Sequence, residues 1–386
     1  MKFIDYESSD KKEWNRLVDE SPDGWLYQTP GYVDWAIFEG AESLSFAVHT
    51  DTDELVAVCP LYLMVRPVYT DNRFARILQR VIRVLVRVIS GRSVFELRSL
   101  QTGYSGPALS ATLGAKGRKS LLRKIMAHVD DLARANRIDV VEIRMTENCE
   151  SLSPQRRPHA NPLHTVGVYE QVSVPPRMVA LLDLDRSEAE LRSALDEDCR
   201  SAVNKARKMG LAFRSDSGEG LDLYHRIHTD SWNRTAGHAH AREHFEGMYR
   251  MLDGEKTIRL FFAERDGEAI AAVMHHVYKD SVFYYGGCSL EAAKTLKGNN
   301  FLLYESIMWA KAEGYKTFCV GLFDCCPGIS HKEYGVGQYK AQFANEYYPA
   351  FEAKKLYTQK GRRDDNKKRK ALLAVENSRA ERPRQR

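Results

Sequence analysis

Apolar and polar residues follow strand and helix spacings in the same order in both halves of the chain. In the first half, residues 45–50 and 55–63 alternate on either side of a polar turn, which predicts a β-hairpin. A strand at 93–100, a helix at 119–136 with a clear helical period, and a buried strand at 138–145 follow. Strands interleaved with helices in this way predict a mixed α/β unit.

The second half repeats that order. Ser187 followed by Glu190 forms a capping box, which predicts the start of a helix, and Gly210 suits its end. Asp266-Gly267 suits the turn of a hairpin. Further helices are expected at 221–232, 244–252 and 302–313, and strands at 177–183, 259–264, 269–278, 281–286 and 317–322. The pattern therefore predicts a duplicated α/β fold and not a short-period solenoid.

Length and composition agree with two domains. The chain has 386 residues, of which 43% are hydrophobic and 28% charged, enough for two cores. We divide it into domains at 1–171 and 172–356 and a basic tail at 357–386, expected to be disordered or weakly helical. Seven cysteines without a CxxC pair and a start without an apolar stretch exclude a disulfide scaffold, a zinc ribbon and a secretory signal. A reducing, cytoplasmic setting is expected.

Charge is distributed unevenly, although the net charge is only +5. Residues 66–92 contain seven arginines and one acid, and five of those arginines recur at helical spacing. Such a basic amphipathic helix suits the headgroup region of an anionic membrane but is not apolar enough to span it. A helix that packs on its own domain with a solvated arginine face fits equally well. The arginines of the stripe are Arg73, Arg76, Arg80, Arg83 and Arg87.

Several kinds of catalytic chemistry lack their motifs. The histidines at 225, 228, 238, 240 and 244 gather in one region, but no HExxH motif or partner at ligand spacing completes a metal site. Cys325-Cys326 near His331 is more typical of small buried residues than of a thiolate nucleophile. No GxSxG elbow or phosphate-binding loop occurs. The Arg207-x-x-Gly210 match to the acyl-coenzyme A pyrophosphate loop falls at a predicted helix end, where it is a chance match.

A series of short segments in the second half resembles the Fem-type (FemAB-like) aminoacyl- and acyltransferases. Residues 198–210 resemble the family's basic helix that leads to a glycine, and 229–237 its threonine–arginine–glycine segment. Residues 336–343, Val-Gly-Gln-Tyr-Lys-Ala-Gln-Phe, resemble its closing aromatic–lysine motif. The resemblance covers about residues 10–350. It implies two tandem domains of the GNAT acetyltransferase fold, each a mixed twisted sheet flanked by helices.

The resemblance also implies a reaction, the transfer of an acyl or aminoacyl group to an amine. The family's motif lysine falls on Lys340, which we expect to stabilise the negative oxygen of the tetrahedral centre, with Tyr339 shaping the pocket. Asp324, after a predicted strand, is a candidate to take a proton from the amine. Candidates for binding phosphate or carboxylate groups, with surface cations as the alternative, are Arg200, Lys205 and Arg234.

For the substrate, the resemblance implies an amine of a cell-envelope precursor, for example of peptidoglycan, or of a polysaccharide precursor. In relatives that act on nucleotide-linked precursors, the early part of the first domain can supply a phosphate-binding cation. Residues 17–65 of this chain contain no lysine or arginine, which disfavours a nucleotide-linked acceptor, and the arginine stripe favours a lipid-linked one at the inner membrane face. The donor is charged tRNA or an acyl thioester; no cofactor and no stable DNA binding are expected. The alternatives are acetyl-coenzyme A-dependent N-acetylation of a soluble amine, and a non-catalytic membrane-associated binding protein on a degenerate transferase fold.

Overall fold

The computed structural model describes residues 1–67, 93–99, 106–144, 171–173, 177–216, 220–234, 239–324, 331–344, 346–349 and 352–380. The arginine stripe at 73–87 lies outside the described residues, as do His238 and the Cys325-Cys326 pair. Among the described residues, none of the helices has both the length and the apolar character needed to cross a bilayer.

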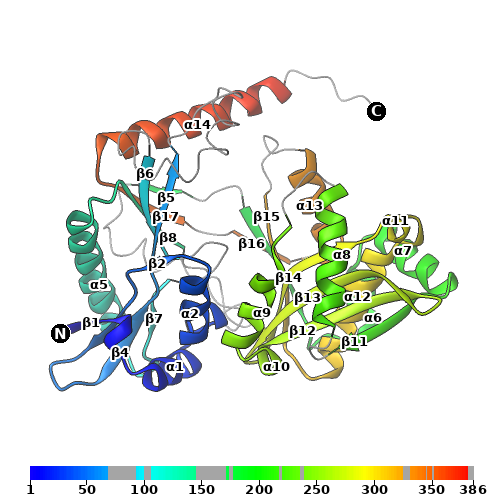
Figure 1. Ribbon diagram of the computed structural model, residues 1–386, viewed down its shortest axis with the longest axis horizontal. Helices are drawn as coiled ribbons and strands as arrows, with labels where there is room; N and C mark the ends of the chain where they lie inside the picture. Colours follow the sequence, from blue (N-terminus) through cyan, green and yellow to red (C-terminus); the bar gives the residue numbers. More distant parts are fainter. Residues whose placement is uncertain are drawn as a thin grey trace.

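The described residues of the first domain form two sheets, packed with the helices α1 (Lys11–Glu20), α2 (Pro30–Phe38) and α5 (Ala115–Ala135) (Figure 1). One sheet has the order β1 (Lys2–Asp5), β3 (Phe46–His49), β4 (Leu55–Cys59) and β7 (Ala108–Leu109). The other has the order β2 (Glu42–Ser43), β5 (Tyr62–Pro67), β6 (Ser93–Arg98), β8 (Val140–Arg144), β17 (Glu352–Leu356) and β9 (Gln171–Ser173).

Local sequence explains where these elements begin. Asp10 accepts hydrogen bonds from the backbone N–H groups of the first turn of α1, and Thr29 with Pro30 starts α2. The predicted helix at 119–136 is α5, whose apolar face is buried. The strand expected at 55–63 is instead two strands, because the ladder stops at Pro60 and β4 and β5 join different sheets.

The second domain is built on one seven-stranded sheet. Its order is β11 (Ala212–Asp216), β12 (Ile258–Arg265), β13 (Glu268–Tyr278), β14 (Ser281–Ser289), β15 (Thr317–Asp324), β10 (Arg177–Asp183) and β16 (Glu346–Pro349). β12 and β13 form the predicted hairpin, and both residues of its turn, Asp266 and Gly267, have positive φ. The capping box of Ser187 and Glu190 starts α6 (Glu188–Ala194), as predicted.

Helices cover both faces of this sheet (Figure 1). One face carries α8 (Leu221–Arg234), α9 (Arg242–Met251) and the short α10 (Gly254–Thr257). The other carries α6, α7 (Glu197–Lys208), α11 (Ala292–Leu296), α12 (Gly298–Ala312) and, beyond β15, α13 (His331–Ala341). The apolar sides of α8 and α9 pack with β12 and β13 in one core, and those of α7 and α12 pack on the opposite face.

The chain passes from the six-stranded sheet of the first domain to the seven-stranded sheet of the second domain and back. β9 belongs to the six-stranded sheet and β10 to the seven-stranded sheet. Later β16 completes the seven-stranded sheet, and β17 returns to pair with β8 and β9. The second sheet therefore runs from Arg177 to Pro349, whereas the expected domain was 172–356.

The tail that follows β17 is a helix, α14 (Gln359–Ala380), which corrects the expectation of a disordered or weakly helical tail (Figure 1). Its first turns are held against the first domain. Lys360 Nζ lies 2.8 Å from an oxygen of the buried Asp139, and Asp364 and Asp365 are themselves buried. These polar contacts have no apolar periodicity and were therefore invisible in the sequence.

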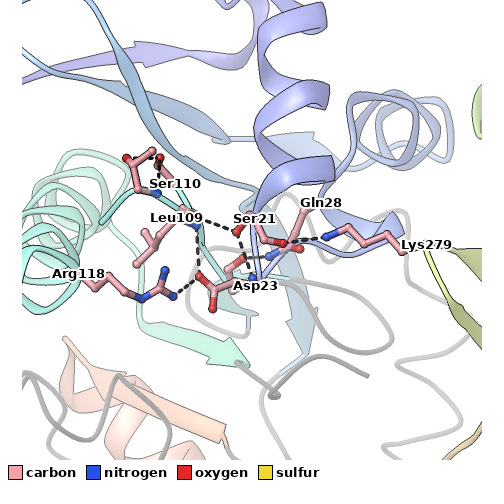
Figure 2. A network of polar contacts seen from close by, with 9 residues as sticks. Ser21, Asp23, Gln28, Leu109, Ser110, Arg118 and Lys279 are labelled. Atoms are coloured by element: carbon pink, nitrogen blue, oxygen red, sulfur yellow. Dashed lines mark hydrogen bonds and ion pairs between the residues drawn. The ribbon is translucent and has the colours of Figure 1, made fainter. Parts of the chain in front are cut away.

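The segment between α1 and α2 joins the two domains. The rings of Trp25 and Tyr27 in this segment, and of Tyr32 in α2, are buried in the core that α8 and α9 form on the sheet of the second domain. Figure 2 shows the polar side of this junction: Lys279 of the second domain donates to the carbonyl of Ser21 at 2.8 Å, and Asp23 pairs with Arg118 of α5. Burial raises the pKa of the Asp23 carboxyl, while Arg118 opposes that rise.

Candidate active site

The second sheet opens between two neighbouring strands. β14 and β15 are parallel and pair over three residues, ending at Phe283 with Cys319. On the outer ladder of each strand the register then shifts, which leaves Tyr285 as the extra residue of β14 and Val320 as that of β15. Bulges of this kind bend a strand and increase its twist, so the two strands separate beyond this point.

The ammonium of Lys340 lies beside this opening. Gly321, the residue after the β15 bulge, has φ of +90°, and a Cβ added there would lie 3.1 Å from Lys340 Nζ. The same Nζ lies 5.5 Å from the centre of the Tyr284 ring on β14. Lys340 comes from the last turn of α13, so this helix delivers a cation to the gap between the diverging strands.

Two cavities meet at Lys340, one on each side of the sheet. The α12 cavity, of about 320 Å³, is lined by Val273, Asn299, Leu302, Leu303, Val336 and Tyr339. The α8 cavity, of about 300 Å³, is lined by Tyr27, Tyr224, His228, Trp232, His240 and Tyr285. Tyr284, Gly287 and Lys340 line both. A reaction centre at the gap can therefore be reached by one molecule from each face.

Glycine is required in the shared wall. A Cβ on Gly287 would lie 2.4 Å from the Tyr284 hydroxyl, so any side chain there would displace this phenol. Burial raises the pKa of Tyr284, which keeps the phenol neutral next to Lys340. On the α12 side, the Tyr339 hydroxyl donates to the carbonyl of Asn299 at 2.9 Å and fixes the ring at the cavity wall.

The α8 cavity combines aromatic walls with neutral histidines. Its first-domain wall is Tyr27, whose hydroxyl is 3.1 Å from Nδ1 of the buried His276. His228 Nε2 accepts the backbone N–H of His240 at 3.2 Å. Burial, reinforced by the neighbouring histidines, lowers the pKa of His228 to about 4. No group of three or more metal-ligating side chains suited to a metal ion occurs in the described part of the chain.

The site residues expected from the sequence fall into two sets. Lys340 lines both cavities and Tyr339 lines the α12 cavity, whereas Arg200, Lys205 and Arg234 line neither of the two. Arg200 donates to two carbonyl oxygens at the end of α6, and Arg234 pairs with Asp230 and Glu291. Lys205 is exposed on α7. Asp324 is the last residue of β15, and its side chain is not described. The binding roles of these residues remain predictions.

Sequence reasoning missed most of the wall. Tyr27, Tyr284, Tyr285 and Gly287 were not singled out, although the run Tyr-Tyr-Gly-Gly at 284–287 is unusual inside a predicted strand and points to a bulge or a close approach. The pyrophosphate-loop match at Arg207 lies at the end of α7, where Arg207 pairs with Glu305 at 2.7 Å. This position agrees with the interpretation of the match as chance.

Residues 193–340, from α6 to Lys340, match the family model described as an acetyltransferase (GNAT) domain. A comparison with curated protein sequences gives no match. Among solved structures, FemX is similar at 14% identity with a TM-score of 0.64, covering 93% of this chain and 98% of that one.

Two further structures are similar at 11% identity. The C-terminal domain of a putative lysylphosphatidylglycerol synthetase from Agrobacterium fabrum has a TM-score of 0.53 and covers 95% of both chains. A tandem GNAT protein from the clavulanic acid biosynthesis pathway has a TM-score of 0.50, covering 93% of this chain and 99% of that one. The expected tandem GNAT fold is thus confirmed, and within the second domain residues 193–340 match the model of an acetyltransferase (GNAT) domain.

Proposed function

We propose that this GNAT-fold acyltransferase forms an amide on an amine of a cell-envelope or polysaccharide precursor, with an aminoacyl-tRNA or an acyl thioester as the donor. The observation that supports this proposal is the place of Lys340, whose ammonium lines both cavities at the gap between β14 and β15. A reacting carbonyl at the gap is accessible to its donor from one face and to an amine from the other.

Lys340 supplies the electrostatic part of the reaction. The amine nitrogen attacks the carbonyl carbon of the donor, and the carbonyl oxygen becomes negative as the new C–N bond forms. A partly buried ammonium beside the gap between β14 and β15 stabilises this oxygen more than a fully hydrated one would, because the local dielectric constant is lower than that of water. The tetrahedral centre then breaks its C–O or C–S bond, which leaves the amide and the released tRNA or thiol.

The linings of the cavities suggest which molecule enters each. The α12 cavity has apolar walls, including Leu302, Leu303 and Val336, which suit the body of an acyl or aminoacyl group. The α8 cavity contains His228, whose lowered pKa keeps it neutral at pH 7, and several aromatic rings. A cavity lined by neutral histidines and aromatic rings presents little positive charge to repel an amine, so we place the acceptor on the α8 side.

An envelope acceptor is favoured by two lines of support. The chain shares its fold over nearly its whole length with FemX and with the C-terminal domain of a putative lysylphosphatidylglycerol synthetase, an enzyme named after an aminoacylated lipid. The arginine stripe at 73–87, as a membrane contact, would bring the protein to a lipid-linked amine. For a tRNA donor, α14 offers exposed cations at Arg362, Arg363, Lys367 and Lys370.

A second candidate function is N-acetylation of a soluble amine from acetyl-coenzyme A. The description of the matching family model as an acetyltransferase domain favours it. The two candidates differ in the acceptor, an envelope-type amine or a soluble one, and only the first can use charged tRNA. An assay that varies both donor and acceptor therefore separates them.

The test uses the full chain with two donors, alanyl-tRNA and acetyl-coenzyme A. Each is mixed with lysine-containing and diaminopimelate-containing muropeptides, with a lipid-linked muropeptide and with glucosamine, and products are measured by mass spectrometry. We expect a mass gain of one alanyl group on an envelope-type amine, lost in Lys340→Met and kept in Lys256→Met, which removes an exposed lysine of α10. Acetylation of glucosamine alone would select the second function, and transfer by neither donor would contradict both.

A further inference from the structure

Two glycines bring helix α2 of the first domain unusually close to α9 of the second. A Cβ on Gly31 would lie 2.2 Å from the carbonyl oxygen of Met251, and a Cβ on Gly247 would lie 2.5 Å from the Phe38 ring. The guanidinium of Arg250, also on α9, lies over the same Phe38 ring, 5.6 Å from its centre. The close packing places the residue that ends α2, Glu39, next to the first turn of α9.

Glu39 contacts a histidine of that turn. Its Oε2 lies 2.7 Å from Nδ1 of His244, which is buried. A carboxylate accepts hydrogen bonds only, so Nδ1 is the nitrogen that carries the proton. The other ring nitrogen, Nε2, lies 3.4 Å from the hydroxyl of Tyr285 and is left as an acceptor for it.

The imidazole of His244 is held in place by rings on several elements. It stacks on His240 with ring centres 4.0 Å apart. It also makes edge-to-face contacts with Trp35 and Phe245, whose ring centres lie 5.2 and 5.0 Å from its own. Three titratable groups face this imidazole: Glu39 at the end of α2, His240 in the segment before α9, and Tyr285 in β14. His228 of α8 lies beyond His240. Glu39 is the only carboxylate in contact with the imidazole among the described residues.

Tyr285 connects this pair to the reaction centre. It is the bulged residue of β14, and it lines the α8 cavity together with Lys340. Its ring stacks on His276 with centres 4.4 Å apart. Burial raises the pKa of Tyr285, so the phenol stays protonated and acts only by passing a proton on.

We propose that Glu39, His244 and Tyr285 form a proton relay that removes the proton of the attacking amine in the α8 cavity. This inference rests on the proposed function. As the amine nitrogen bonds to the carbonyl carbon, its proton moves to the Tyr285 oxygen, and the phenol proton moves to His244 Nε2. The resulting imidazolium is stabilised by Glu39. The proton leaves through solvent or with the departing oxygen or sulfur, which restores the relay.

The relay is preferred over the other base in the same cavity. His228 Nε2 is already occupied as the acceptor of the His240 N–H, and no carboxylate contacts its ring among the described residues. The 3.4 Å contact between His244 and Tyr285 is long for a catalytic hydrogen bond, as is common before substrate is bound. Because Glu39 belongs to the first domain, proton removal in the second domain depends on the contact between α2 and α9.

The test compares two nucleophiles with the donor that supports transfer in the assay above. A muropeptide amine must lose a proton to the protein, whereas hydroxylamine is a strong, weakly basic nucleophile that needs no protein base. We expect Tyr285→Phe to lower kcat with the muropeptide by about 100-fold, and Glu39→Gln by about 10-fold, with little change in KM. With hydroxylamine both variants should retain the wild-type rate, whereas Lys340→Met should lose activity with both nucleophiles.

Matched controls are Tyr249→Phe and Glu246→Gln, which lie on α9 outside the relay and should behave as the wild type. If Tyr285→Phe fails to fold, as judged by thermal unfolding, His244→Gln replaces it with the same expectation. Wild-type rates in Tyr285→Phe and Glu39→Gln, with Lys340→Met inactive, would overturn the relay and leave the proposed function intact. Equal losses with both nucleophiles would show a structural role and overturn the relay. A wild-type chain that transfers nothing would overturn both proposals.

Discussion

Gly321 leaves room for Lys340. A Cβ at Gly321 would lie 3.1 Å from Lys340 Nζ and 3.5 Å from the carbonyl oxygen of Tyr284, across the gap between β14 and β15. The φ of +90° at this glycine follows directly after the bulge of β15. The backbone conformation that separates the strands and the space for the ammonium thus arise at the same residue.

Gly321→Ala should therefore lower activity as well as stability. The positive φ costs an alanine about 1–2 kcal/mol, and the new methyl displaces Lys340. We expect at least about a 10-fold loss of kcat, a fraction of what a lost oxyanion donor costs. Gly267→Ala is the control, because Gly267 has φ of +83° in the β12–β13 turn and nothing within 4 Å of its Cβ position. We expect the two variants to have similar melting temperatures, with activity lost only in Gly321→Ala. Equal activities in the two variants would show that Lys340 takes no part in the reaction.

The contact between α2 and α9 can be tested with a compensating pair. Gly247→Ala places a methyl 2.5 Å from the Phe38 ring and should destabilise the chain by about 1–3 kcal/mol through overpacking. Phe38 is partly exposed, so Phe38→Ala alone should cost less. In the double variant the space is restored, and urea unfolding should show a coupling energy of at least about 1 kcal/mol. Strict additivity would mean that the two helices do not pack as described.

Buried histidines predict how stability depends on pH. His275 is fully buried, and burial lowers its pKa to about 3. Between that value and the usual 6.5 the unfolded chain binds a proton at this position and the native chain does not, so stability falls as pH falls through this window. His275→Gln should reduce the slope of unfolding free energy against pH by about 1.4 kcal/mol per unit near pH 5. Parallel curves for variant and wild type from pH 4 to 6.5 would refute this.

Helix α14 should be an integral part of the first domain. Lys360→Met removes the cation 2.8 Å from Asp139, which keeps its bonds to the Phe95 N–H and the Thr358 hydroxyl. The loss of one partner from a buried carboxylate should cost about 2 kcal/mol in chemical denaturation. Lys256→Met, which breaks an exposed pair with Asp253, should leave stability close to that of the wild type, because water screens such a pair. Equal stabilities would indicate that α14 is not held through Lys360.

The sequence predicts features that depend on neighbouring residues. The capping box at Ser187, the turn at Asp266-Gly267 and the period of α5 all appear where expected, because a few adjacent side chains determine each of them. Tyr339 and Lys340 were found through a local motif, and both line the α12 cavity.

Other features depend on residues far apart in the chain. Glu39 and His244 are 205 positions apart, and no periodicity connects them. The return of β17 to the first sheet and the polar attachment of α14 are likewise set by tertiary contacts. Arg234 was chosen because it matches a family segment. In the fold its guanidinium pairs with Asp230 and Glu291, and its binding role stays a prediction.

The central claim is that Lys340 stabilises the oxyanion of acyl transfer, and single-turnover kinetics test it most directly. The full chain is loaded with labelled alanyl-tRNA or acetyl-coenzyme A, mixed with the accepted amine and quenched at set times. The account predicts that Lys340→Met slows the chemical step by about 100- to 1,000-fold while donor binding is unchanged. A single-turnover rate in Lys340→Met equal to that of the wild type would contradict it.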